Sequence, residues 1–237
     1  MFSALAHRAL YLPDDRIMQS VASPPSSKQR FTWLASVSLG PANHYSTLAL
    51  LCKQEGTYSG KRVRTYDCSF LLRYEINKSY EQIADDVREL FTDPRLHKAT
   101  LVLERTAVGL PVLDLFRKIP ARIVPLQLTG SAVKAEPDGR GGWIVPKVEL
   151  TSLMQVLLAG RRPEDPQSAL FAVADNMGET AALLHAEWQS FTSRLQTTVS
   201  KDTSLVWRET ANEDLCLAVA CGCWVAEYCQ RRLAIGF

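Results

Sequence analysis

Short apolar runs separated by polar turns fill the chain from about residue 30 to residue 76. The runs cover Thr32 to Gly40, Ser46 to Gln54 and Arg62 to Ile76, and residues 55–61 between the last two contain two glycines. Three β-prone runs in succession with short connections are typical of an antiparallel meander. The pattern therefore predicts that the fold begins with three antiparallel strands.

Helical and strand patterns alternate after this meander. Ser79 and Gln82 have the spacing of a capping box, and the apolar residues that follow fall on one helical face. A short apolar run from Ala99 to Glu104 predicts a buried strand, and Pro111 can begin a second helix. A further strand is expected over Ala121 to Leu128.

Pro125 lies inside that last strand, and because proline cannot donate to a strand ladder, it predicts an edge position or a bulge. The order of three strands, helix, strand, helix and strand indicates an α/β fold: a mixed sheet, its first three strands antiparallel, flanked by helices.

The second half of the chain is mainly helical. The polar, glycine-rich stretch from Gly130 to Trp143 predicts a loop or a flexible hairpin. Helices are expected over Val148 to Gly160, Glu179 to Gln196 and Asn212 to Leu233, with a candidate strand over Thr203 to Glu209.

Composition restricts the class of protein. The chain has 237 residues, 46% of them apolar and 22% charged, and its 27 basic and 25 acidic residues give a formal charge of +2. These values fit one globular domain, expected over residues 31–237 after a flexible lead over residues 1–30, and exclude a polybasic tail or an acidic solvating chain. No apolar run approaches the roughly 18 residues of a membrane helix, so we expect a cytoplasmic chain without a membrane partner.

Three carboxylates stand where acids can do chemistry. Glu104 ends a predicted strand, and a carboxylate at the carboxyl end of a central strand points into a crevice. Glu213 and Asp214 begin the last helix, where acids are also favoured simply by the helix dipole. Together the three acids could bind Mg²⁺ or Mn²⁺, which prefer oxygen ligands and support phosphodiester hydrolysis.

Basic residues offer contacts for nucleic-acid phosphates. Lys147, Arg140 and Lys134 lie in or after the glycine-rich stretch, and further cations follow Gly60, although each is also explained as an ordinary surface residue. The segment from Gly56 to Arg62 superficially resembles a phosphate loop. Its glycines are one residue too close and no helix follows, so we interpret it as a turn.

Five stretches in register resemble the nuclease domain of phage terminase large subunits, in particular a prophage-associated group without the ATPase half. The similarity extends from Trp33 to Tyr228. The matching stretches are Ser38–Leu51 (with LG and TLALL), Leu71–Phe91 (LLRYEINKSYEQIADDVRELF), Leu101–Phe116 (LVLERTAVGLPVLDLF), Val124–Ser131 with Gly141–Leu150 (VPLQLTGS, GGWIVPKVEL), and Trp207–Trp224 (WRETANEDLCLAVACGCW).

This resemblance implies a ribonuclease-H-like fold, DNA as substrate, Mg²⁺ or Mn²⁺ as cofactor, no small-molecule cofactor and phage packaging proteins as partners. It places the family's second catalytic acid at Glu104 and its third at Glu213 or Asp214. The first acid position is Ser38, and a second acid that is common beyond it is replaced by His44.

Several functions therefore remain open. The chain is a terminase-type metal-dependent DNA endonuclease impaired by the loss of the acid at Ser38, with His44 or Asp67 as auxiliary ligands, or a nuclease active only within a larger assembly. The alternatives are a non-catalytic nucleic-acid-binding or packaging module with a vestigial site, and a ribonuclease-H-like protein that serves only as an assembly scaffold. The contacts around Ser38 discriminate between them, because a neutral serine cannot bridge two cations as a carboxylate does.

Overall fold

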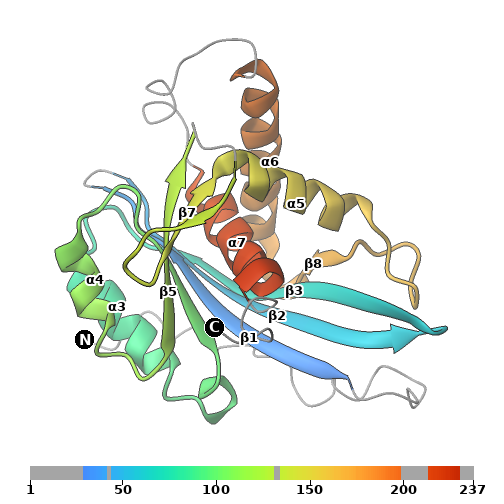
Figure 1. Cartoon of the computed structure of the whole chain (residues 1–237), viewed down its shortest axis with the longest axis horizontal. Helices are drawn as coiled ribbons and strands as arrows, with labels where there is room; N and C mark the ends of the chain where they lie inside the picture. The colour runs from blue at the N-terminus through green and yellow to red at the C-terminus, as the bar shows by residue number, and fades with distance from the viewer. Residues whose placement is uncertain (1–28, 42–43, 131–133, 199–212, 230–237) are drawn as a thin grey trace.

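The strand β1 (Arg30–Ser38) lies near the centre of a single eight-stranded mixed sheet in the order β6-β7-β5-β4-β1-β2-β3-β8 (Figure 1). The structure is a computed structural model that describes residues 29–41, 44–130, 134–198 and 213–229. The other strands are β2 (Thr47–Tyr58), β3 (Lys61–Arg73), β4 (Thr100–Glu104), β5 (Arg122–Thr129), β6 (Glu136–Pro137), β7 (Trp143–Pro146) and β8 (Phe171–Val173). The helices are α3 (Tyr80–Leu90), η1 (Pro94–Leu96), α4 (Leu110–Phe116), α5 (Lys147–Ala159), η2 (Asp175–Met177), α6 (Gly178–Thr198), α7 (Asp214–Trp224) and the π-helical turn η4 (Val225–Cys229).

The strand directions match the sequence expectation. β1 pairs antiparallel with β2, and β2 with β3, whereas β4 runs parallel to β1 and β5 parallel to β4. The predicted ribonuclease-H-like α/β arrangement, a mixed sheet with three leading antiparallel strands and flanking helices, is confirmed.

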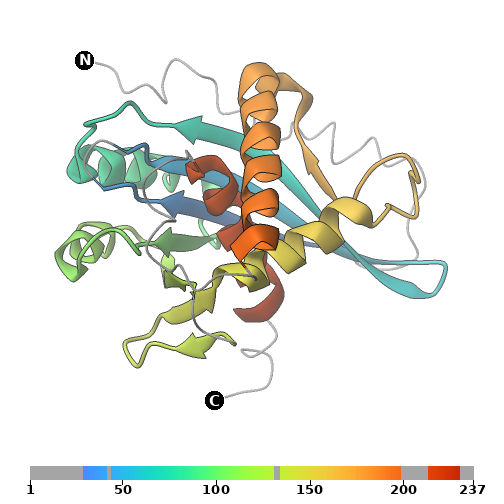
Figure 2. The ribbon, with the colours of Figure 1, turned by 90° about the horizontal axis from the view of Figure 1, so that it is seen from above.

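Side chains of β1 alternate between two separate cores. Leu34 belongs to the core under α5, α6 and α7, whereas Ala35 and Val37 belong to the core under α3 and α4. Since successive strand residues point to opposite faces, a strand buried on both sides is mostly apolar along its length. The result is three layers, with α3 and α4 on one face of the sheet and α5, α6 and α7 on the other (Figures 1 and 2).

Helix α7 packs directly on the sheet. Every residue from Asp214 to Trp224 except Leu217 is buried, and Gly222 allows the close approach. A Cβ on Gly222 would lie 2.3 Å from Leu51 Cδ1 and 3.1 Å from Ser36 Cβ. The small residues of α7, three cysteines, two alanines and one glycine, are thus explained by the short distance between helix and strands.

Local signals predicted several element boundaries correctly. Ser79 and Gln82 form both hydrogen bonds of a capping box at the start of α3. The segment after Gly56 is a hairpin turn in which Ser59 and Gly60 both have positive φ, as the two central residues of a type I′ turn require. The glycine-rich stretch is also a hairpin, because β6 pairs antiparallel with β7.

Two expectations need correction. Strand β5 lies between β4 and β7 instead of at an edge, and it tolerates Pro125 because the pairing with β7 begins only at Leu126. The short strand β8 was not predicted; it pairs with β3 in parallel over three residues. The candidate strand over residues 203–209 and the predicted end of the last helix at residues 230–233 lie outside the described residues, as does nearly all of the expected lead.

None of the helices in the described ranges is long and apolar enough to cross a membrane.

Replacing Gly222 by valine should lower the free energy of unfolding by about 1–3 kcal/mol, because the added methyl groups overlap Leu51 and Ser36. Gly130→Val is the matched control, since a Cβ there has no neighbour within 4 Å, and it should change stability by less than about 0.5 kcal/mol. Urea unfolding of both variants measures the difference. Equal stabilities would contradict the close approach of α7 to the sheet.

Candidate functional site

A row of polar residues crosses four adjacent strands beneath α7. The registers pair Glu104 on β4 with Ser38 on β1, Ser38 with Thr47 on β2, and Thr47 with Arg73 on β3. Residues directly opposite one another in a sheet share a face. Glu104, Ser38, Thr47 and Arg73, hereafter the polar row, therefore lie side by side at one end of these strands.

Glu104 is buried, and polar neighbours within the fold bond both of its carboxylate oxygens. The Ser38 hydroxyl donates to Oε2 at 3.0 Å, and the backbone N–H of Thr106 donates to Oε1 at 2.7 Å. Only 3% of Glu104 is exposed. Ser38 thus acts as a hydrogen-bond donor to the acid beside it.

Asp214, the first residue of α7, is held by the other half of the row. Its Oδ2 accepts hydrogen bonds from Thr47 Oγ1 at 2.7 Å and from Arg73 Nε at 2.8 Å. A second guanidinium nitrogen, Arg73 Nη2, lies 3.3 Å from Asp214 Oδ1. Charge-assisted contacts of this forked kind are the strongest that a carboxylate makes with a side chain.

Glu187 on α6 completes this network. Its Oε1 forms an ion pair with Arg73 Nη2, and its Oε2 accepts from the backbone N–H groups of Leu215 and Cys216 at 2.9 and 3.1 Å. The first N–H groups of a helix have no partner within the helix and favour negative charge. Glu187 therefore caps α7 from a different helix, while Arg73 contacts both Glu187 and Asp214.

Glu213 and Lys147 form a separate pair near the polar row. Lys147 Nζ, on the first residue of α5, lies 3.8 Å from Glu213 Oε2. Only 6% of Glu213 is exposed. Lys147, which was expected to contact phosphates, therefore pairs with Glu213, one of the predicted metal ligands.

Different carboxylates influence the thiols towards the two ends of α7. Burial raises the pKa of both Cys216 and Cys221. Carboxylates raise it further: Glu213 and Asp214 act on Cys216, whereas Glu104 acts on Cys221. Since a helix rises 1.5 Å per residue, these two thiols are separated by about 7.5 Å along the axis. Glu104 thus acts on a different part of the helix from the other two acids.

The donor set at the polar row does not fit Mg²⁺ or Mn²⁺. Within the described ranges, no group of three His, Cys, Asp or Glu side chains is placed to hold a metal ion. The backbones of Glu104 on β4 and of Thr47 on β2 lie two strand spacings apart, roughly 9.6 Å, with Ser38 between them. A guanidinium already compensates the charge of Asp214.

The remaining predicted site residues lie apart from the row. His44 is exposed in the loop before β2. Asp67 accepts hydrogen bonds from Gln54 and Arg162 and lies on the sheet face opposite to that of its neighbour Tyr66. Both proposed auxiliary ligands are therefore outside the polar row.

The cations predicted for nucleic-acid contact lie around the β6–β7 hairpin. Lys134 and Arg140 are exposed there. Asp138 orders the turn by accepting from the backbone N–H groups of Arg140 and Gly142. Trp143 packs edge-on against Trp224 with ring centroids 5.8 Å apart, which agrees with a packing role.

Sequence reasoning missed three residues of the network: Thr47, Arg73 and Glu187. Thr47 and Arg73 are the first and last residues of their strands, and the register alone brings them beside Ser38. If strand partners are assigned by counting back from the β2–β3 turn, the partner assigned to Thr47 is one residue short of Arg73. The bulge near Leu50 and Leu51 causes this difference, because it shifts the register by one residue. No sequence pattern indicated a role for Glu187, because a glutamate within an amphipathic helix is ordinarily solvated.

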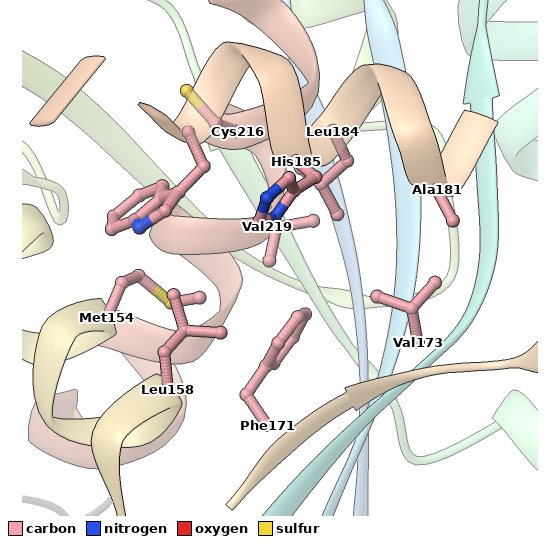
Figure 3. Close-up of a pocket in the computed structure, with 10 residues that line it drawn as sticks. Met154, Leu158, Phe171, Val173, Ala181, Leu184, His185, Cys216 and Val219 are labelled. Carbon is pink, nitrogen blue, oxygen red and sulfur yellow. The ribbon is translucent and has the colours of Figure 1, made fainter. Parts of the chain in front are cut away.

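An apolar cavity of about 200 Å³ lies between α5, α6, α7 and β8, where side chains from these elements face one another (Figure 3). Its lining includes Met154, Phe171, Leu184 and His185, and no carboxylate, lysine or arginine contributes to it. Cys216 also lines it, but burial raises the pKa of this thiol well above its usual value and leaves it protonated.

Comparisons with known proteins give one structural likeness. No family model matches the chain, and no curated protein matches it. A similar solved structure is the large terminase nuclease from thermophilic phage G20c, with 10% sequence identity and a TM-score of 0.45. The alignment covers 84% of this chain and 83% of that nuclease.

Proposed function

We propose that this chain is a non-catalytic ribonuclease-H-like module that binds nucleic acid, and that its nuclease-type acid positions serve as internal contacts. One observation carries the proposal: Arg73 binds the carboxylate of Asp214, where a nuclease would need a metal ligand. The terminase-like motifs imply DNA as the bound nucleic acid and phage packaging proteins as partners.

The electrostatics of the network support the absence of hydrolysis. Two-metal hydrolysis needs divalent ions to generate hydroxide and to stabilise the leaving oxygen. A divalent ion beside Asp214 would be repelled by the Arg73 guanidinium, and this repulsion is poorly screened because only 19% of the Arg73 side chain is exposed. Ser38 meanwhile supplies a neutral donor where a bridging carboxylate would be required.

A nicking assay on supercoiled plasmid with Mn²⁺ tests the absence of hydrolysis. Wild type and Glu104→Ala should both leave the plasmid intact, because the carboxylates do not form a metal site. Ser38→Asp is the informative third variant, since it places a carboxylate between Glu104 and Thr47. Nicking that appears only in this variant would identify a vestigial site. Mn²⁺-dependent nicking by wild type that disappears in Glu104→Ala would contradict the proposal and favour the endonuclease.

Metal independence should also be visible in stability. The melting temperature of wild type should be the same within about 1 °C in 5 mM Mn²⁺ and in excess EDTA. A site with a Kd one hundredth of the metal concentration would instead add about 2.7 kcal/mol to the free energy of unfolding. Differential scanning fluorimetry makes the comparison, and a saturable rise in melting temperature with Mn²⁺ would overturn the conclusion that the acids are internally compensated.

Arg73→Ala should lower the free energy of unfolding by about 2–4 kcal/mol, because Asp214 and Glu187 would be left buried without their counter-ion. Arg88→Ala is the matched control, since it removes only an exposed pair with Asp85 and should cost less than about 0.5 kcal/mol. Guanidinium unfolding measures both. If the two variants lose the same stability, Arg73 does not compensate the acids.

A further inference from the structure

Among the residues that the structure describes, the outer part of the β2–β3 hairpin is a two-stranded ribbon with no further strand paired to it. Pairing of β1 with β2 ends at Arg30 and Glu55, and β8 pairs with β3 only over Tyr66–Cys68. Beyond these positions, residues 56–58 pair with residues 61–63 and with no other strand in the described part of the chain. Figures 1 and 2 both show the tip of the hairpin extending past the helices.

The tip exposes an aromatic ring and cations. Tyr58 is 47% exposed and the Arg62 side chain 71% exposed, and Lys61 is exposed between them. No acidic residue occurs from Gly56 to Arg64. Because Ser59 and Gly60 close the ribbon in two residues, these side chains are presented on a short, ordered turn.

Carboxylates lie at the base of the ribbon instead of its tip. Glu55 pairs with Arg62 at 3.1 Å and with Lys53 at 3.4 Å, and Glu227 pairs with Arg64. Both carboxylate side chains are only 11% exposed. Two acids thus face five cations in this region, a net charge of +3; the cations are Arg30, Lys53, Lys61, Arg62 and Arg64.

The exposed cations occupy both faces of the ribbon. Lys61 lies directly opposite Tyr58, so the two side chains share one face. Arg62 lies opposite Thr57 and points to the other face, which it shares with Arg64. A single strand running over one face would contact only one of these sets, whereas phosphates on two sides of the ribbon would contact both.

We propose that the β2–β3 ribbon inserts into a groove of a nucleic-acid duplex, with Lys61 and Tyr58 against one flanking strand and Arg62 on phosphates of the other. A two-stranded ribbon fits the major groove of B-form DNA, which is about 12 Å wide. The inference rests on the proposed function and names its binding surface. Tyr58 is eleven residues along β2 from Thr47, or about 36 Å from the polar row.

Fluorescence anisotropy with the full chain and a labelled 20-base-pair duplex tests the proposal. Lys61→Ala/Arg62→Ala should weaken binding at least tenfold at 100 mM salt and reduce the slope of log K against log salt by about 2, because two phosphate contacts are lost. Tyr58→Ala should weaken binding while leaving the slope unchanged. The control is Lys98→Ala/Lys118→Ala, which removes two exposed cations from the α3–α4 side and should leave affinity within twofold of wild type.

Three results would overturn the proposal: no duplex binding by wild type, equal affinities and slopes for the hairpin and control variants, or equal or tighter binding of the single strand of the same sequence. Melting temperatures of all variants should stay at the wild-type value, because the substituted side chains are exposed. Duplex binding that is equally strong in wild type and in the hairpin variants would overturn the role of the ribbon but would be consistent with the proposed function. Cleavage by wild type would overturn the proposed function without affecting the ribbon.

Discussion

The buried guanidinium of Arg73 is the constraint on which the position of α7 depends. Helix α7 presents an almost entirely apolar surface to the sheet, and apolar contacts alone fix neither its rotation nor its axial position. Arg73 fixes the rotation and axial position of α7, because it joins β3 to Asp214 on α7 and to Glu187 on α6. Removing Arg73 would leave both buried carboxylates without their counter-ion, so the three elements are coupled.

The opposite end of α7 is fixed by a second group of charges. Lys53 on β2 donates to the backbone carbonyl of Ala226 at 2.8 Å, and Glu227 accepts from Tyr66 and pairs with Arg64. Burial lowers the pKa of Lys53, while the nearby carboxylates of Glu227 and Glu55 oppose that shift. A cation near the end of a helix also interacts favourably with its dipole. The helix is therefore held by sheet residues at both termini, with Gly222 setting its closest approach between them.

Local patterns in the sequence were sufficient for the fold and insufficient for the site. The capping box at Ser79, the β2–β3 turn and the three leading strands depend on neighbours in sequence, so they were predictable. The polar row depends on register, which joins residues 66 positions apart at Ser38 and Glu104 and 141 apart at Arg73 and Asp214. Motif resemblance located the acids, but no local signal revealed that an arginine from β3 binds one of them.

The replacement of an acid by serine and the use of arginine at the polar row are physically linked. Three carboxylates close together repel one another, and in a nuclease the metal ions offset that repulsion. With Ser38 in the middle, Glu104 needs only hydrogen-bond donors, and it has two. Asp214 still requires a positive charge in a buried setting, and Arg73 supplies it without desolvating an ion from solution. Because this compensation is internal, the fold can persist without bound metal. The ribbon lies about 36 Å away, so nucleic-acid binding there does not depend on whether the carboxylates of the polar row are protonated or bind a metal.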